Sequence, residues 1–359
     1  MSENNPTSTD TRAGEMPAAT APQALTTATT TVLIDADDVT DDSASELGGS
    51  VASSSTSVSS SIREYREENG RTYHRYKDGK YNIPNDEREN DRLDLQHNLC
   101  LLTFDNKLGL APPNEPDSAV KRVLDVGTGT GIWAIDFAED HPDAEVLGFD
   151  LSPSMPDFVP LNVKFEIDDL EEEWTWTEPF DYIHSRFMNS SIPDWTEYAL
   201  KAFTHLAPGG YFEIQDVNLF LQSDDNTLKS DHPLTRCMTL MYEASVIFGR
   251  PFQDLSALKK VFEDVGFLDV EMHIYKWPTN TWPKLAKYQE LGAWNNANIG
   301  GGIEALSMAP LTRALGWTKE EVQVLLAGVR KDLNNRSIHA YWPIYCIFGR
   351  KPLESKDVE

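Results

Sequence analysis

Between residues 117 and 276, the chain alternates short, almost wholly apolar runs with stretches in which apolar residues recur every three or four positions. Runs of the first kind are typical of strands buried on both faces of a parallel sheet, and the second spacing is typical of helices packed against it. We expect strands at 121–126, 144–150, 162–167, 179–186 and 209–217, with helices at 132–141 and 194–206. Strands and helices in alternation, with short links, predict a parallel sheet with right-handed crossovers.

The second half of the pattern adds two strands and two helical insertions to this core. An amphipathic helix at 255–266 is followed by strands at 267–276 and 339–351. The insertions are expected at about 219–252 and 281–334, where apolar residues again have helical spacing. The expected fold is therefore α/β and Rossmann-like, with a mostly parallel seven-stranded sheet, helices on both faces and helical insertions.

The segment 62–116 precedes this core and is expected to form an arm and a helix. Asn69-Gly70 and Asp78-Gly79 are turn signals of a hairpin or an extended arm. Asn85 is placed to cap a helix at 86–106. Two interpretations are open for this segment, because it either covers the ligand site or only packs against the core.

Composition separates the two ends of the chain from the globular part. Residues 1–61 consist mainly of Ser, Thr, Ala and acids, so this segment is expected to be a disordered acidic tail. An apolar island at 32–34 is a candidate strand for a partner's sheet edge, although a chance triplet is the simpler explanation. The main domain is expected at 117–350, and a C-terminal tail at 351–359.

The charge of the whole chain limits the class of partner. The chain has 359 residues, with 58 acidic and 31 basic side chains and a formal net charge of -27. Such a charge repels phosphate backbones, so we expect no direct nucleic-acid binding. The three cysteines are far apart and no apolar run has the length of a membrane span, so we expect neither a metal site nor membrane contact. The expected location is the cytoplasm, the nucleus or both, with protein partners binding through the acidic tail.

A glycine-rich turn after the first core strand is the strongest signal of a ligand site. Gly127, Gly129 and Gly131 stand at every second position, and a helix begins at once. Thr128 lies inside the turn. Such a turn presents bare backbone N–H groups to a ligand at the start of the helix. The dinucleotide fingerprint needs a small residue where this chain has Ile132, so NAD is a poor fit.

Acidic side chains stand at the ends of three core strands. Asp125 lies two positions before the first glycine, and Asp150 ends the second strand, where an acid can bind both ribose hydroxyls of a nucleoside. Asp168 and Asp169 end the third strand. Parallel strands end at one edge of a sheet, so these acids are expected to converge there. Further candidates at the same edge are Leu151, Leu170, Ser185 and Arg186.

The glycine turn resembles motif I of class I S-adenosylmethionine-dependent methyltransferases. The resemblance implies that Asp125 and the glycines hold the methionine moiety of the cofactor. It also implies that an acid at the end of the third strand accepts a hydrogen bond from the adenine amino group, and Asp168 and Asp169 are both candidates for that role.

A longer set of strings resembles the fungal LaeA-like, or TAM-domain, methyltransferases, from about residue 63 to residue 350. The strings are REENGRTYHRY, IPNDERENDRLDLQHNL, VLDVGTGTGIWAIDFA, FDYIHSRFM and LAPGGYFEIQD. The resemblance implies S-adenosyl-L-methionine as cofactor and a small-molecule or peptide acceptor, within fungal secondary metabolism. The alternative that it implies is a regulator of secondary-metabolite gene expression that acts through protein partners in a velvet-type complex.

No catalytic residue is assigned from the sequence. A hydroxyl acceptor would need a base, for which His97 and His184 are candidates, whereas an amine acceptor would need none. Tyr73 or Tyr81 from the arm would favour the positive sulfur by cation–π attraction. Five of the nine tryptophans follow residue 276, and the best candidates for an apolar acceptor pocket are Trp294 and the flexible NIGGG segment at 298–302.

Overall fold

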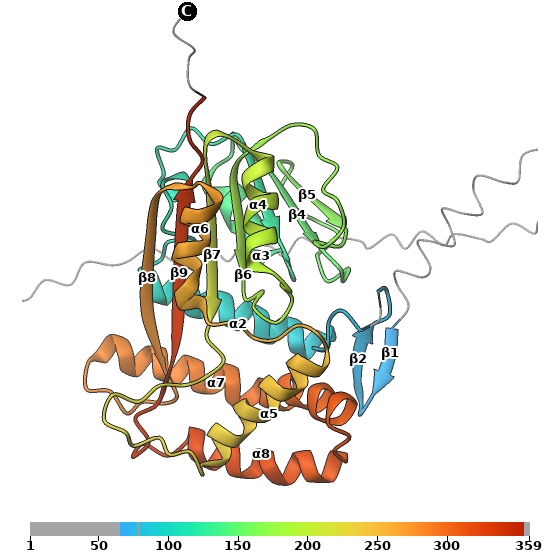
Figure 1. Ribbon diagram of the computed structural model, residues 1–359, viewed down its shortest axis with the longest axis vertical. Coiled ribbons are helices and arrows are strands. Elements are labelled where there is room, and N and C mark those ends of the chain that lie inside the picture. Colours follow the sequence, from blue (N-terminus) through green and yellow to red (C-terminus); the bar gives the residue numbers. More distant parts are fainter. Residues whose placement is uncertain (1–64, 78, 355–359) are drawn as a thin grey trace, which may run out of the picture. The chain divides into compact units, whose positions relative to one another are not determined.

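Seven strands form one sheet, in the order β5-β4-β3-β6-β7-β9-β8 (Figure 1). The computed structural model describes residues 65–77 and 79–354, so the predicted acidic tail, with its apolar island, lies outside the described residues. The strands are β3 (Arg122–Val126), β4 (Glu145–Asp150), β5 (Val163–Ile167), β6 (Phe180–Arg186), β7 (Leu206–Val217), β8 (Leu268–Pro278) and β9 (Tyr341–Arg350).

The pairing within this sheet confirms the predicted mostly parallel arrangement. β3 pairs in parallel with β4 and β6, and the outer pairs β4–β5 and β6–β7 are parallel too. β9 lies antiparallel between β7 and β8. From β3, the chain adds β4 and β5 on one side of the sheet and then crosses over to add β6 and β7 on the other side. Ligands of open α/β sheets bind beside the point where the chain crosses over in this way.

The two faces of the sheet contact different helices because side chains alternate along each strand. Val123 and Tyr182 pack with α3 on one face. Their neighbours Leu124 and Ile183 pack with α4 and α6 on the other face. The helices are α3 (Ile132–Asp140), α4 (Trp195–His205) and α6 (Leu258–Val265). Burial on both faces explains why the strands read as unbroken apolar runs.

A further layer of helices lies beyond the edge at which the parallel strands end (Figure 1). Its members are α2 (Glu87–Thr103), α5 (Pro233–Ile247), α7 (Ala286–Ala309), the π-helix Pro310–Ala314 and α8 (Lys319–Leu333). They bury a shared apolar cluster with Trp277 of β8 and Trp342 of β9. Both predicted insertions are therefore helical. Short 3-10 turns lie at Pro112–Asn114 and Leu255–Ala257, and no helix of the described residues is long and apolar enough to cross a membrane.

The hairpin expected near the N-terminus is present. β1 (Tyr65–Glu68) and β2 (Arg71–His74) pair antiparallel. Asn69 and Gly70 connect them with φ angles of 54° and 81°, the positive values that a two-residue type I′ turn requires. The Asn-Gly signal thus identified the turn correctly.

The predicted cap of α2 is wrong by one residue. Asp86, not Asn85, is the N-cap, and its Oδ1 accepts a hydrogen bond from the Glu89 backbone N–H at 3.1 Å. Asp86 also pairs with Arg71 of the hairpin, at 2.7 Å. Asn85 instead donates from Nδ2 to Ser152 Oγ at 3.0 Å. The tertiary pairing with the hairpin decided which of the two adjacent capping residues begins the helix.

The predicted flexible segment at 298–302 is wrong, since these residues lie inside α7. A Cβ on Gly302 would lie only 2.4 Å from Arg92 Cδ, so the missing side chain lets α2 approach α7 closely. Trp294 on the same helix is 40% exposed and is absent from the lining of the cavity described below. Trp294 therefore does not form a pocket, whereas Asn298 and Ile299 of the predicted segment do line the cavity, from inside a helix.

Candidate active site

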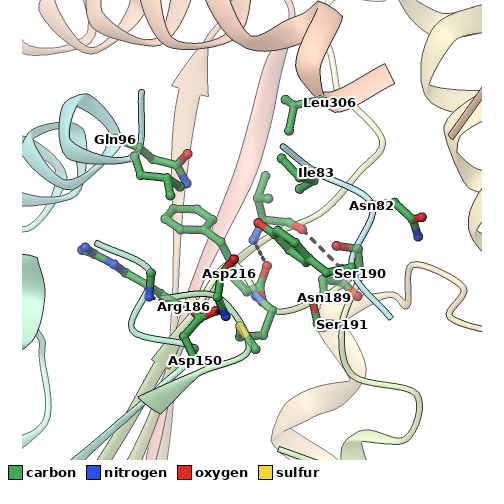
Figure 2. A pocket seen from close by; sticks show the side chains of 18 of the residues that line it. Asn82, Ile83, Gln96, Asp150, Arg186, Asn189, Ser190, Ser191, Asp216 and Leu306 are labelled. Carbon is green, nitrogen blue, oxygen red and sulfur yellow. Dashed lines mark hydrogen bonds between the residues drawn. The ribbon is translucent and has the colours of Figure 1, made fainter. Parts of the chain in front are cut away.

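A cavity of about 300 Å³ lies where the strand ends meet the helix layer. The glycine turn after β3, the ends of β4, β6 and β7, and the residues that follow β5 contribute to its lining, as do the segment before α2, α2 itself, α5 and α7. Figure 2 shows side chains from the segment before α2, from α2 and α7, and from the ends of β4, β6 and β7 around one space. The predicted site residues that line the cavity are Gly127, Thr128, Gly129, Asp150, Leu151, Asp168, Asp169, Leu170 and Arg186.

The glycine turn adopts a conformation that favours glycine. Gly127 and Gly129 have φ angles of 70° and 57°. A Cβ on Gly127 would lie 2.5 Å from Met188 Sδ, whereas Gly129 would meet only Leu93 Cδ1, at 3.7 Å. The backbone at Gly129 is therefore bare toward the cavity, as a cradle for a small ligand requires.

The Asp150 carboxylate is fixed beside this turn. Its Oδ2 accepts from the Gly129 backbone N–H at 3.0 Å, and its Oδ1 accepts from the Ser152 backbone N–H at 2.9 Å. Burial raises the pKa of Asp150, although these two hydrogen bonds oppose the rise. The Asp150 carboxylate thus joins the end of β4 to the glycine turn.

The two acids after β5 have different surroundings. Asp169 is 2% exposed and pairs with Lys80, and its Oδ1 accepts from the Glu171 backbone N–H at 3.1 Å. Burial disfavours its charge, but the Lys80 bond and the backbone bond outweigh burial and lower the pKa of Asp169. Asp168 Oδ1 accepts from the adjacent Asp169 backbone N–H at 2.7 Å. Asp169 thus joins the N-terminal segment to the sheet edge.

Arg186 is held at the end of β6 by a histidine from α2. Its Nη2 lies 3.0 Å from His97 Nδ1, and His97 Nε2 lies 2.8 Å from Asp136 Oδ2. Since a guanidinium only donates, Nδ1 must accept, which leaves the proton on Nε2 for Asp136. Burial lowers the pKa of His97, so the imidazole is neutral and holds Arg186 by accepting.

Three predicted site residues lie beneath the cavity lining. Asp125 Oδ2 accepts from Thr128 Oγ1 at 2.6 Å, and its Oδ1 lies 2.8 Å from His184 Nδ1. Gly131 caps α3, and a Cβ there would lie 2.4 Å from Phe165. Ser185 is 0% exposed. These three residues therefore support the glycine turn and the strand ends from below. Thr128, which lines the cavity, connects Asp125 to it.

Of the candidate bases and the candidate aromatic residues, one of each lines the cavity and the other lies outside its lining. His97 and Tyr81 line the cavity. His184 is fully buried and stacks on Trp133 at a centroid distance of 3.7 Å, away from the lining. Tyr73 is 1% exposed, and Arg313 lies over its ring at 4.5 Å. Among the described residues, no group of three His, Cys, Asp or Glu is placed to hold a metal ion.

Sequence reasoning missed several lining residues that come from β7, from the loop after β6 and from the helix layer. Asp216 was identifiable, because it is the penultimate residue of the fifth strand, β7, close to the edge at which Asp150 ends the second. The residues from the helix layer carried no such signal, since apolar residues of a core and of a pocket have the same spacing. Trp277 and Trp342 belong to the five late tryptophans that indicated an apolar pocket, although Trp294 was favoured among them. The missed residues include Asn189, Ser190, Ser191, Asp216, Met238, Met241 and Ile303.

The chain is similar in sequence to methyltransferases, both to a family and to individual proteins. A family model described as a methyltransferase domain matches residues 95–272. The chain is 40% identical over 301 residues to methyltransferase pytC of Aspergillus terreus, covering 84% of this chain and 92% of that protein. It is 34% identical over 299 residues to the probable methyltransferase tdiE of Emericella nidulans, covering 82% and 92%.

A third relative is named as a regulator and not as a methyltransferase. The chain is 38% identical over 290 residues to the secondary metabolism regulator LAE1 of Cochliobolus heterostrophus, covering 79% of this chain and 94% of that protein. Among solved structures, phosphoethanolamine N-methyltransferase 2 of Haemonchus contortus, in complex with S-adenosyl-L-methionine, aligns with a TM-score of 0.40 at 18% identity, covering 73% and 52%. The strand order, and not this weak alignment, carries the fold class.

Proposed function

This chain belongs to the fungal family of LaeA-like, or TAM-domain, methyltransferases, and we propose that it transfers a methyl group from S-adenosyl-L-methionine to a small molecule or peptide of fungal secondary metabolism. The observation that carries the proposal is one cavity that combines the bare glycine turn, the buried Asp150 carboxyl and the residues after β5. These groups have the polar character of a nucleoside site, and the cavity extends beyond them into the helix layer. A donor and an acceptor would therefore meet in one water-poor space.

The residues of the sheet edge fit the parts of such a donor in order. Asp150 would bind the ribose hydroxyls, as acids at this strand end do in dinucleotide sites. Asp168 is favoured over Asp169 for the adenine amino group, because Asp169 is already paired with Lys80. Arg186 would bind the carboxylate of the methionine moiety by a charge-assisted hydrogen bond.

The bound donor would supply a methyl group on a positively charged sulfur, which makes transfer an in-line displacement. The chain would orient the two reactants and exclude water from them. Lys80 to Asn85, before α2, line the same cavity as the glycine turn, which favours a covering role for the N-terminal segment.

Isothermal calorimetry with S-adenosylhomocysteine tests this proposal directly. We expect saturable one-to-one binding to the full chain, and loss of measurable binding in Gly129→Arg and Asp150→Ala. Gly129→Arg introduces a side chain at a φ of 57° next to the cavity, and Asp150→Ala removes the buried acid. Asp117→Asn, an exposed acid outside the cavity lining, is the matched control and should bind as the wild type does. Absence of binding by the wild type would refute the proposal.

A second candidate function is regulation of secondary metabolism through protein partners, in the cytoplasm or the nucleus. It is favoured by the relative named as a secondary metabolism regulator, which is 38% identical to this chain. The two functions separate in a fungal strain that lacks the gene. If a Gly129→Arg chain restores the metabolite profile as well as the wild type does, then regulation without methyl transfer is the better description.

A further inference from the structure

The inner part of the cavity, away from the glycine turn, is apolar and comes from the helix layer and the adjoining strands. Its lining includes Met238, Met241, Phe252, Trp277, Ile303 and Trp342. We call this part the inner compartment. The residues proposed above for the donor all lie at the sheet edge, so the inner compartment is the part of the cavity left for a second ligand.

Asp216 is a carboxyl group in the lining of this cavity. In the view of Figure 2 it lies between Arg186 on one side and Asn189 and Ser190 on the other. Its Oδ2 accepts from the Met188 backbone N–H and its Oδ1 from the Val217 backbone N–H, both at 2.7 Å. The Asn189 backbone N–H also interacts with this carboxyl. A carboxylate has about four lone-pair sites, so Asp216 can still accept a hydrogen bond from a ligand.

Burial gives this carboxyl the proton affinity of a base that works near neutral pH. Asp216 is 0% exposed, and burial raises its pKa to about 7 against the lowering effect of the backbone N–H groups. A side chain whose pKa lies near the working pH is suited to general base catalysis.

Two asparagines on one face of α7 belong to the lining of the same cavity, and each has one buried polar side-chain atom without a partner. Asn295 and Asn298 are 0% and 1% exposed, and both line the cavity. Asn298 Oδ1 accepts from Arg92 Nη1 at 2.8 Å, while its Nδ2 has no partner. Asn295 Nδ2 donates to the Pro278 backbone O at 3.0 Å, while its Oδ1 has no partner.

The partners of the two asparagines fix the orientation of their amide groups. A guanidinium can only donate and a backbone carbonyl can only accept, so neither amide can be flipped without losing a bond. One free donor on Asn298 and one free acceptor on Asn295 therefore remain in a buried site. Buried polar groups without partners are costly, and a ligand that carries a C=O and an N–H would satisfy both.

We propose that the inner compartment binds an apolar acceptor with an amide group and a hydroxyl group, and that Asp216 takes the hydroxyl proton while Asn295 and Asn298 contact the amide. The inference rests on the proposed function, because it assigns the second ligand of the same cavity. It makes Asp216 the catalytic base and the two asparagines specificity-determining residues.

The transfer balances with these residues alone once both ligands are bound. The acceptor oxygen forms a bond to the methyl carbon as the bond from that carbon to the sulfur breaks, and the sulfur leaves as a neutral thioether. The hydroxyl proton passes to Asp216, which returns it to water after product release. No oxidant or further reactant is needed.

The test uses three bicyclic probes that differ by one group each, titrated into the complex of the full chain with S-adenosylhomocysteine. 4-Hydroxy-2-quinolone carries the amide and the hydroxyl, 2-quinolone lacks the hydroxyl, and 1-naphthol lacks the amide. We expect 4-hydroxy-2-quinolone to bind about tenfold more tightly than either partner probe, the size of one charge-assisted hydrogen bond.

Two conservative variants assign these differences to residues. In Asp216→Asn, 4-hydroxy-2-quinolone should bind no more tightly than 2-quinolone, while the affinity for S-adenosylhomocysteine stays unchanged. Asn298→Asp keeps an oxygen for Arg92 but replaces the unpaired N–H donor with an acceptor. In this variant, 4-hydroxy-2-quinolone should therefore bind no more tightly than 1-naphthol. Asp117→Asn should change neither. With S-adenosylmethionine, transfer of labelled methyl to 4-hydroxy-2-quinolone should fall at least a hundredfold in Asp216→Asn while the KM for the donor stays unchanged.

The outcomes separate this inference from the proposed function. If S-adenosylhomocysteine binds but 4-hydroxy-2-quinolone binds no better than the two partner probes, the acceptor assignment is wrong and the donor site stands. Equal losses of all three probes in Asp216→Asn would show that this residue shapes the compartment without reading the hydroxyl, which also overturns the proposal. If S-adenosylhomocysteine itself does not bind, the proposed function fails first.

Discussion

A single buried carboxyl group shows how a residue suited to chemistry opposes folding. Asp216 has an ordinary pKa of 3.8 as a free side chain and about 7 in the fold. The folded state therefore holds its proton over a pH range in which the unfolded chain has lost it. By linkage, the free energy of unfolding falls as pH rises from about 4 to about 7, by an amount on the order of 4 kcal/mol.

The first prediction follows from this sign. Asp216→Asn has no proton to lose, so its melting temperature relative to the wild type should increase as pH rises from 4 to 8. Tyr198 senses the Asp216 charge, but burial raises its own pKa, so it stays neutral in this range. Thermal denaturation of both proteins at matched ionic strength measures the difference. A difference that stays constant with pH would contradict the raised pKa of Asp216.

The second prediction concerns Arg186, which His97 holds at the cavity lining. Arg186→Gln should weaken S-adenosylhomocysteine binding by about 10- to 100-fold, the usual loss for a hydrogen bond between charged groups. Methylthioadenosine lacks the amino-acid carboxylate, so its affinity should barely change. Calorimetry with both compounds gives the comparison, and Arg330→Gln on the surface of α8 is the control. Equal losses for both compounds would mean that Arg186 does not contact the carboxylate.

At the scale of elements, the glycines of α7 adapt one helix to close neighbours. A Cβ on Gly292 would lie 2.1 Å from the Asn280 backbone O, whereas a Cβ on Gly300 would meet nothing within 4 Å. Both residues lie inside the same helix. Their substitutions therefore separate the intrinsic helix preference of alanine from the space required for packing.

The third prediction uses that pair. Gly300→Ala should raise the free energy of unfolding by about 0.5–1 kcal/mol, because alanine loses less backbone entropy in a helix. Gly292→Ala should lower it by about 1–3 kcal/mol, because the backbone of Asn280 must move. Urea denaturation followed by circular dichroism measures both variants. If both stabilise the protein to the same extent, the close approach of α7 to Asn280 is not present in solution.

At the scale of the whole molecule, two parts of the fold share one cavity. The sheet edge contributes the glycine turn and the acids, while α2, α5 and α7 contribute the rest of the lining. A ligand that contacts both parts should stabilise them together, since binding to the native state alone raises the free energy of unfolding.

The fourth prediction is a pattern of amide hydrogen exchange. Saturating S-adenosylhomocysteine should slow exchange in the residues after β3 and β5, and also in Lys80 to Asn85 and the first turns of α2, which line the same cavity. The Gly129→Arg chain under the same conditions is the control. Slower exchange confined to the sheet edge would show that the N-terminal segment does not cover the donor.

The sequence by itself determined the sheet and the polar half of the candidate site. Strands buried on both faces give unbroken apolar runs, and parallel strands end at one edge, so the positions of Gly127, Gly129, Asp150 and Asp168 followed from local pattern and chain order. The Asn69-Gly70 turn followed from the φ angles that only a few residues tolerate. These features depend on neighbours in sequence.

Only the tertiary structure decided which residues of the helix layer face the cavity. Apolar residues have the same helical spacing in a core and in a pocket, so Trp294 was favoured although Trp277 and Trp342 line the cavity. The glycines at 298–302 were expected to be flexible, yet they lie inside α7, where Gly302 allows close packing with α2. Asn295 and Asn298 became informative only once burial showed which of their atoms lack partners. Burial and pairing depend on segments far apart in sequence, and no local pattern contains them.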